Sequence, residues 1–215
     1  MRGKWSLSLV SPAAMLALCL CAPGALAYNY SKSITIDRSK IPNTCGTTLA
    51  NYPMLFSVTD ANLKVTGGHV TDAAGDDIIF RGLDATTCGG PSSCTLDHQI
   101  EKYVNTTGEL VAWVRVPALN TSAAGSNTVI YVYYGNSSVT TPTENPSGVW
   151  DANFKGVWHL KETDIDGGSG DIKDSTGNAN NGTTSGSGTA QVAGKIDGSF
   201  DFGSTGIVTV PDASS

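Results

Sequence analysis

The sequence predicts an all-β protein built as an antiparallel β-sandwich. Apolar residues recur at every second position in several short segments, which is the period of a strand with one buried face. Loops rich in glycine, asparagine and serine separate these segments, and no apolar stripe of helical period extends over three turns. Many short strands joined by such loops are typical of an antiparallel sandwich and not of a fold that alternates strands with helices.

Most of the predicted strands precede residue 137. Ile34 and Ile36 alternate with polar neighbours in the first strand, and Gly135 ends the last one as a turn. In the longest strand, one face consists of Leu110, Ala112, Val114 and Val116. The predicted strands are residues 32–37, 52–60, 76–82, 108–119 and 127–136, and the pattern resumes in 156–162, 198–204 and 206–212.

Residues 1–27 are predicted to be a secretory signal peptide. A basic start is followed by a short apolar centre and by the sequence "ALA" at positions 25–27, which has the form of a cleavage site. Cys19 and Cys21 leave a lipid-anchored alternative open, although the bulky Leu18 stands where such signals have a small residue. We therefore expect a secreted protein that is extracellular or at the cell surface.

The charge of the chain after residue 27 restricts its partners. Eleven basic and 19 acidic residues remain there, a net charge of −8. Nucleic acid and anionic membranes both need a basic face on their partner, so this charge argues against them. No later apolar run approaches the roughly 20 residues of a membrane-spanning helix. The expected partner is a glycan or a cell-surface protein.

Three cysteines remain after residue 27, and in an exported protein they are more often structural than catalytic. Cys88 and Cys94 close the short segment "CGGPSSC", whose glycines and proline can bend enough to join the two sulfur atoms. We predict a disulfide between them, which leaves Cys45 without an assigned partner. A zinc site is disfavoured because the sequence has no CxxC pair.

A linker is predicted where the strand pattern stops. Residues 140–148 contain two prolines and no apolar periodicity. They separate a first module, residues 28–139, from a second segment, residues 149–215.

Five stretches of the first module resemble a bacterial family called domain of unknown function 2341. They are "YPMLFSV" (52–58), "GDDIIF" (75–80), "LDHQIEKY" (96–103), "AWVRVPAL" (112–119) and "IYVYYGN" (130–136). The resemblance implies a β-sandwich over residues 28–139, with the Cys88–Cys94 loop as an insertion. In the second stretch, Asp76 and Asp77 are expected to accept hydrogen bonds from backbone N–H groups and not to bind a metal.

Residues 149–215 resemble the start of a concanavalin A-like or laminin-G-like jelly roll. The stretches that carry this resemblance are "VWHL" (157–160), "DSTGN" (174–178) and "GSFDF" (198–202). It implies an incomplete jelly-roll β-sandwich, because a whole one needs about twice this length. We therefore expect the chain to be a fragment of a longer protein.

Strand aromatics are the first candidates for a ligand site. Trp113, Tyr131 and Tyr133 could present a platform for the apolar face of a sugar, and cross-strand packing is the alternative. In "VWHL", strand alternation predicts that Trp158 packs inward and that His159 points outward.

An acidic segment is the second candidate. Asp164, Asp166, Asp171 and Asp174 lie among glycines, an arrangement that could converge on a calcium ion. The alternative is a solvated acidic loop. A retaining glycosidase would need two carboxylates on one continuous strand, and the glycines of this segment interrupt any such strand.

No catalytic motif stands out. The sequence has no GxSxG, HExxH or phosphate-binding loop, and its histidines lie in no recognisable motif. We therefore predict a non-enzyme, an extracellular recognition module for a glycan or a cell-surface protein. Two alternatives stay open: the non-catalytic front part of a polysaccharide-degrading enzyme, and a structural spacer in an adhesin.

Overall fold

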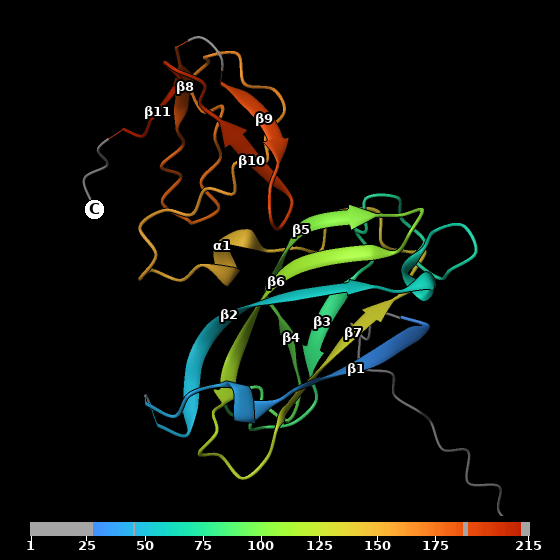
Figure 1. Ribbon diagram of the computed structural model, residues 1–215. Coiled ribbons are helices and arrows are strands. Elements are labelled where there is room, and N and C mark those ends of the chain that lie inside the picture. The colour runs from blue at the N-terminus through green and yellow to red at the C-terminus, as the bar shows by residue number, and fades with distance from the viewer. Residues whose placement is uncertain (1–27, 45, 187–188, 212–215) are drawn as a thin grey trace, which may run out of the picture.

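The computed structural model describes residues 28–44, 46–186 and 189–211. It has two β-rich parts, a larger sandwich that contains β1 to β7 and a smaller part that contains β8 to β11 (Figure 1). The predicted signal peptide and Cys45 lie outside the described residues.

The sandwich consists of two antiparallel sheets, which confirms the predicted fold class. The four-stranded sheet has the order β1 (Tyr30–Ile36), β7 (Thr128–Tyr134), β3 (Ile79–Gly82) and β4 (Cys94–Leu96). The three-stranded sheet has the order β2 (Thr48–Thr59), β6 (Glu109–Asn120) and β5 (His98–Val104). Two short 3-10 helices, η1 (Arg38–Lys40) and η2 (Ala61–Leu63), follow β1 and β2 respectively.

The core lies between these two sheets. The predicted inward face of β6 is confirmed, because Leu110, Ala112, Val114 and Val116 are all fully buried. Side chains from the opposite sheet complete the core, among them Phe80, Ile130, Val132 and Tyr134. In each strand, the residues between these core positions therefore point to the outer face of the sheet.

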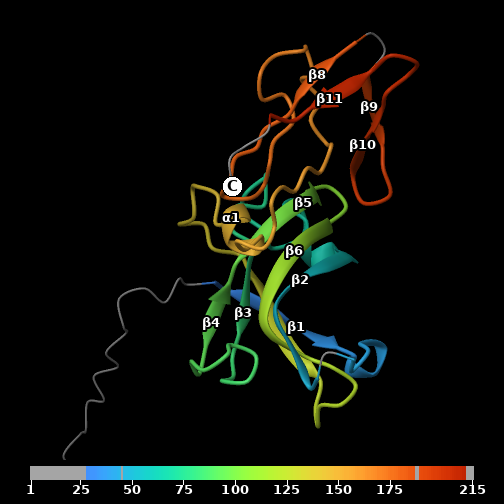
Figure 2. The same ribbon diagram turned by 90° about the vertical axis from the view of Figure 1, so that its left-hand side faces the viewer.

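The smaller part is built from two strand pairs. In one pair β8 (Thr183–Ser185) joins β11 (Ile207–Thr209), and in the other β9 (Ala190–Ala193) joins β10 (Gly198–Asp201). The short helix α1 (Pro146–Val149) precedes this part and lies beside β5 and β6 (Figure 2). Within the described ranges, no helix is long and apolar enough to cross a membrane.

The strand predicted over residues 156–162 does not form. Only an isolated bridge between Trp158 and Asp174 is present there. Leu160 has φ 57°, in the left-handed region, which interrupts the extended backbone that a strand needs. The side chain of His159 is consequently not directed to solvent as predicted, since it is only 10 % exposed.

The predicted Cys88–Cys94 disulfide is confirmed, with 5.8 Å between the two Cα atoms. Cys94 begins β4, where it is opposite Gly82 of β3. A Cβ atom at Gly82 would lie 2.7 Å from the Cys88 sulfur, so only glycine leaves room for the bridge.

Replacing both cysteines with serine is expected to lower the free energy of unfolding by about 2–3 kcal/mol, because the closed loop restricts the unfolded chain. Urea denaturation followed by circular dichroism measures this change. Reduction of the unmodified protein with dithiothreitol should produce a similar loss. An unchanged denaturation midpoint in both experiments would contradict the prediction.

Candidate functional site

The outer face of the three-stranded sheet is covered by residues that follow the sandwich. Trp113 on β6 is opposite Gln99 on β5, and both alternate with residues of the core. The buried Trp150, at the end of α1, packs its ring against Trp113 in an edge-on arrangement with 5.2 Å between ring centroids. This covered sheet face forms the base of the candidate site.

Gln99 is the centre of a hydrogen-bond network on this face. The indole N–H of Trp150 donates to Gln99 Oε1 at 2.8 Å, and Gln99 Nε2 donates to Ser175 Oγ at 2.8 Å. Because an indole nitrogen can only donate, this contact fixes the orientation of the amide. His159 Nε2 lies 3.1 Å from the same Oε1, and its Nδ1 lies 2.8 Å from Glu101 Oε2. Both ring nitrogens of His159 therefore lie next to side-chain oxygen atoms.

Glu101 is a carboxylate held in a mostly buried position, 5 % exposed. Burial by itself raises the pKa of its carboxyl, but the contact with His159 and the charges of His159 and Lys161 outweigh burial, so the pKa of Glu101 lies below its ordinary value. Lys161 Nζ donates to the carbonyl oxygens of Ile100 and Glu101 at 3.1 and 3.0 Å. These contacts attach the segment after α1 to strand β5.

Two neighbouring hollows above this network form what we call the polar groove. One has a volume of about 440 Å³ and the other about 380 Å³, and both are lined by Glu162, Thr163 and Lys173. The first is further lined by Gln99, Glu101, His159, Lys161, Ser175 and Asp197, and the second by Asp164, Ser169, Gly170 and Asp171. Apart from Gly170, every lining side chain is polar, and both hydrogen-bond donors and acceptors are present.

The predicted calcium residues are only partly brought together. Asp164 and Asp171 line the polar groove, whereas Asp174 accepts four hydrogen bonds from nearby residues and thereby holds its own loop. Asp166 accepts a hydrogen bond from the backbone N–H of Gly168 at 2.8 Å. No group of three or more potential ligands that could hold a metal ion occurs among the described residues. Calcium binding stays a prediction.

The three predicted platform aromatics lie on two different sheets. Trp113 is on the outer face of the three-stranded sheet, where Trp150 packs against it. Tyr131 and Tyr133 are on β7 of the four-stranded sheet, and both alternate with the core residues Ile130 and Val132. A single platform of all three is therefore not formed.

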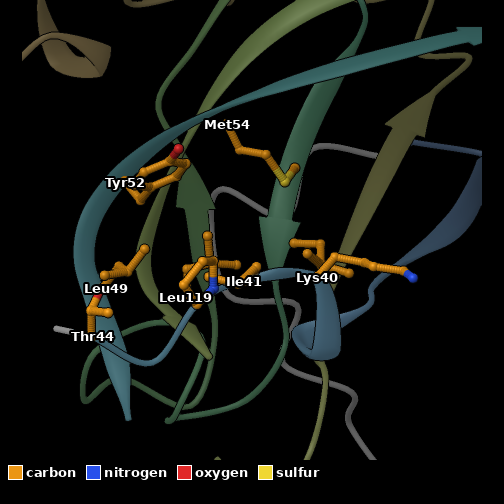
Figure 3. Close-up of a pocket in the computed structure, with 9 residues that line it drawn as sticks. Lys40, Ile41, Thr44, Leu49, Tyr52, Met54 and Leu119 are labelled. Atoms are coloured by element: carbon orange, nitrogen blue, oxygen red, sulfur yellow. The ribbon is translucent and has the colours of Figure 1, made fainter. Parts of the chain in front are cut away.

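A separate apolar hollow of about 370 Å³ lies at one end of the sandwich (Figure 3). Tyr52 and Met54 of β2 line it together with Leu119 of β6 and Lys40 of η1. In Figure 3 the ammonium group of Lys40 points away from the other labelled side chains. A polar ligand is bound mainly through hydrogen bonds, and the polar groove presents more donors and acceptors than the apolar hollow does. We therefore take the groove as the candidate site.

Comparisons with known proteins find one family whose model matches part of this region. The family described as "Domain of unknown function (DUF2341)" matches residues 89–167. No curated protein and no solved structure matches the chain. The matched range supports the resemblance seen in the sequence. It contains Gln99, Glu101, Trp113, Trp150 and His159, so most of the network at the base of the groove lies within it, and Ser175 lies outside it.

Sequence reasoning missed Gln99 and Glu101 as site residues. Both are polar residues at alternate positions of a segment that reads as a half-buried strand, and this pattern predicts that their side chains are exposed to solvent. The one signal that could have pointed to these residues is that "VWHL" and "LDHQIEKY" both carry side chains that can form hydrogen bonds or ion pairs. Nothing in the sequence indicates that these two segments meet.

The contribution of Glu101 to stability is expected to depend on pH. Because its pKa is lower in the folded protein than the value of about 4.3 for an unfolded chain, this contribution is complete above that value and is lost as the pH falls through the lower, folded-state pKa. Urea denaturation at several pH values below 6 should therefore show a shallower acid loss for Glu101→Gln than for the unmodified protein. Parallel curves for the two proteins would contradict the prediction.

Proposed function

We propose that the protein is an extracellular recognition module that binds a glycan in the polar groove. The supporting observation is the lining of the groove, where ammonium, carboxylate, amide and hydroxyl groups surround two neighbouring hollows. A sugar carries many hydroxyl groups, each of which both donates and accepts, so it can be matched by such a mixed lining. A purely apolar ligand would leave these groups without partners at a cost in free energy.

The proposal includes secretion and a non-catalytic role. Residues 149–215 are proposed to be the N-terminal part of a jelly roll of the concanavalin A-like or laminin-G-like kind, a fold in which loops and a sheet face bind ligands. Glu101 is already paired with His159, and both contact residues that hold the covering segment in place. These contacts favour a supporting role for the pair over acid–base chemistry.

A glycan-array screen of the protein from residue 28 onward, with and without calcium, tests the proposal. Lys173→Met removes a donor that lines both hollows, and Glu162→Gln changes a carboxylate that also lines both. The expected result is a glycan signal that weakens in both variants. The control is Lys195→Met, which removes the same type of charge from an exposed residue that does not line the groove.

Three other outcomes would redirect the assignment. Degradation of a bound polysaccharide would favour the enzyme alternative. A glycan signal that the two groove variants leave unchanged would reject the groove as the site. Absence of binding to any glycan would favour a protein partner or a spacer role. A signal that requires calcium would support the predicted involvement of Asp164 and Asp171.

A further inference from the structure

The outer face of the four-stranded sheet, opposite the side on which the groove lies, carries a row of aromatic residues around one arginine. Arg81 of β3 is flanked by Tyr131 of β7 and Thr95 of β4. Its guanidinium carbon lies 5.6 Å from the ring centroid of Tyr133. The ring of Tyr28 approaches Tyr133 edge-on with 6.3 Å between centroids. We call Tyr28, Arg81, Tyr131 and Tyr133 the arginine–tyrosine face.

The guanidinium of Arg81 has no oxygen partner among the described residues. The other two described arginines both have one: Arg38 donates to the carbonyl of Ser122 at 2.6 Å, and Arg115 donates to Asp97 at 2.9 Å. Arg81 takes part in none of the four ion pairs of the described chain. Its guanidinium instead makes a cation–π contact with the Tyr133 ring.

Two polar atoms of this face are buried without a hydrogen-bond partner within the described residues. They are Nε of Arg81 and the hydroxyl oxygen of Tyr28. Leaving a buried donor unsatisfied costs free energy, and the cost is larger for a charged group. The two Nη groups of Arg81 are not among these buried atoms, so a ligand that supplies acceptor oxygens would contact Arg81 there.

The residues of β1 beside the two tyrosine rings are small. Across β7, the residues opposite Tyr131 and Tyr133 on β1 are Ser33 and Ser31, whose small side chains stand beside the two rings. Serine hydroxyls can also donate to or accept from a ligand. Tyrosine rings offer a flat apolar surface of the kind against which a sugar ring packs.

We propose that the arginine–tyrosine face binds an acidic glycan, with the carboxylate of a uronic acid on Arg81 and its sugar ring against Tyr131 and Tyr133. The planar guanidinium matches a carboxylate through two parallel hydrogen bonds. The charge is complementary, because the chain after residue 27, with 11 basic and 19 acidic residues and a net charge of −8, repels an acidic polymer except where an unpaired cation is presented. This site is distinct from the polar groove, which lies over the other sheet.

Isothermal titration calorimetry of the protein from residue 28 onward, with tetragalacturonate and with its methyl ester, tests the proposal. The ester keeps the sugar rings and removes the charges. The expected affinity for the acid is at least about tenfold higher than for the ester. Arg81→Gln should abolish this preference, and Arg81→Lys should retain part of it because the charge remains without the planar fork.

Controls separate this site from the groove and from general charge effects. Arg115→Gln makes the same change of charge on the other sheet and should leave tetragalacturonate binding unchanged. Lys173→Met should also leave it unchanged. If Lys173→Met abolishes binding, the acid occupies the groove, which overturns this proposal and supports the proposed function. Equal affinity for acid and ester, no binding of either, or tighter binding of a phosphorylated sugar than of the uronate would each overturn it. Circular dichroism verifies that each variant is folded.

Discussion

Replacing Asp77 with alanine is expected to lower the free energy of unfolding by about 4 kcal/mol, which would unfold a marginal protein. Its side chain is fully buried and accepts five hydrogen bonds. The donors are the backbone N–H groups of Thr71, Asp72, Gly135 and Asn136 and the hydroxyl of Thr71. Alanine removes the acceptor and leaves the N–H groups of Gly135 and Asn136 buried without it.

The effect follows from where these donors lie. Gly135 and Asn136 are the turn at the end of β7, and residues 71–72 belong to the long loop before β3. Asp77 therefore ties two distant parts of the chain at one end of the four-stranded sheet. Because each hydrogen bond to an ionised group contributes about 1.5–3 kcal/mol, the loss of several of them exceeds the effect of an ordinary surface substitution.

Urea denaturation followed by circular dichroism measures the effect, and Asp76→Ala is the matched control. Asp76 is adjacent in sequence, and burial together with Asp72 and Asp77 raises the pKa of its carboxyl, so its removal should cost less than about 1 kcal/mol. Asp77→Asn keeps one acceptor oxygen, so its free energy of unfolding should lie between those of Asp77→Ala and Asp76→Ala. Equal stability of the two alanine variants would show that the hydrogen bonds to Asp77 contribute little.

The sandwich could be predicted because strand alternation is a local property. In β6 every second residue is apolar, and the same residues form its buried face, whatever packs against them. The role of Asp77 as an acceptor for backbone N–H groups was also predictable, since short acidic side chains in turns commonly accept them. The Cys88–Cys94 disulfide needed only the flexibility of the seven residues that it closes.

The candidate site could not be predicted in the same way, because it depends on contacts between distant segments. Gln99 and Glu101 have the positions of exposed strand residues, yet Trp150 and His159 cover them. Arg81 is equally ordinary in sequence. Its significance is the absence of an oxygen partner among the described residues, which only the three-dimensional arrangement reveals.

The predicted division of the chain at residues 139 and 140 remains a prediction. The family match crosses this position. Residues of the predicted linker also contact the sandwich: the Thr143 hydroxyl donates to the carbonyl of Ile78 at 3.0 Å, and Glu144 accepts a hydrogen bond from the N–H of Ile100 at 2.8 Å. The strength of the attachment can therefore be measured at its large buried aromatic side chain, Trp150.

Replacing Trp150 with alanine is expected to cost about 3–5 kcal/mol, the range for truncating a large buried aromatic side chain. Trp150 is 6 % exposed, and its ring centroid lies 5.2 Å from those of Trp113 and Phe154 and 5.8 Å from that of His159. Its loss removes the N–H that orients Gln99 and opens a cavity between the sheet and the segment that covers it.

Urea denaturation and limited proteolysis together show whether Trp150→Ala destabilises only the residues after the sandwich or the sandwich as well. If residues 28–139 fold alone, Trp150→Ala should release the later residues to protease while a sandwich fragment survives. If the covering segment belongs to the folding unit, both parts should unfold together at a lower urea concentration.

Trp150→Phe keeps a ring but not the N–H and should cost about 1 kcal/mol. The control is Phe202→Ala, because that ring is 38 % exposed and its removal should change stability little. A denaturation midpoint and a protease pattern that Trp150→Ala leaves unchanged would show that Trp150 does not hold the two parts together.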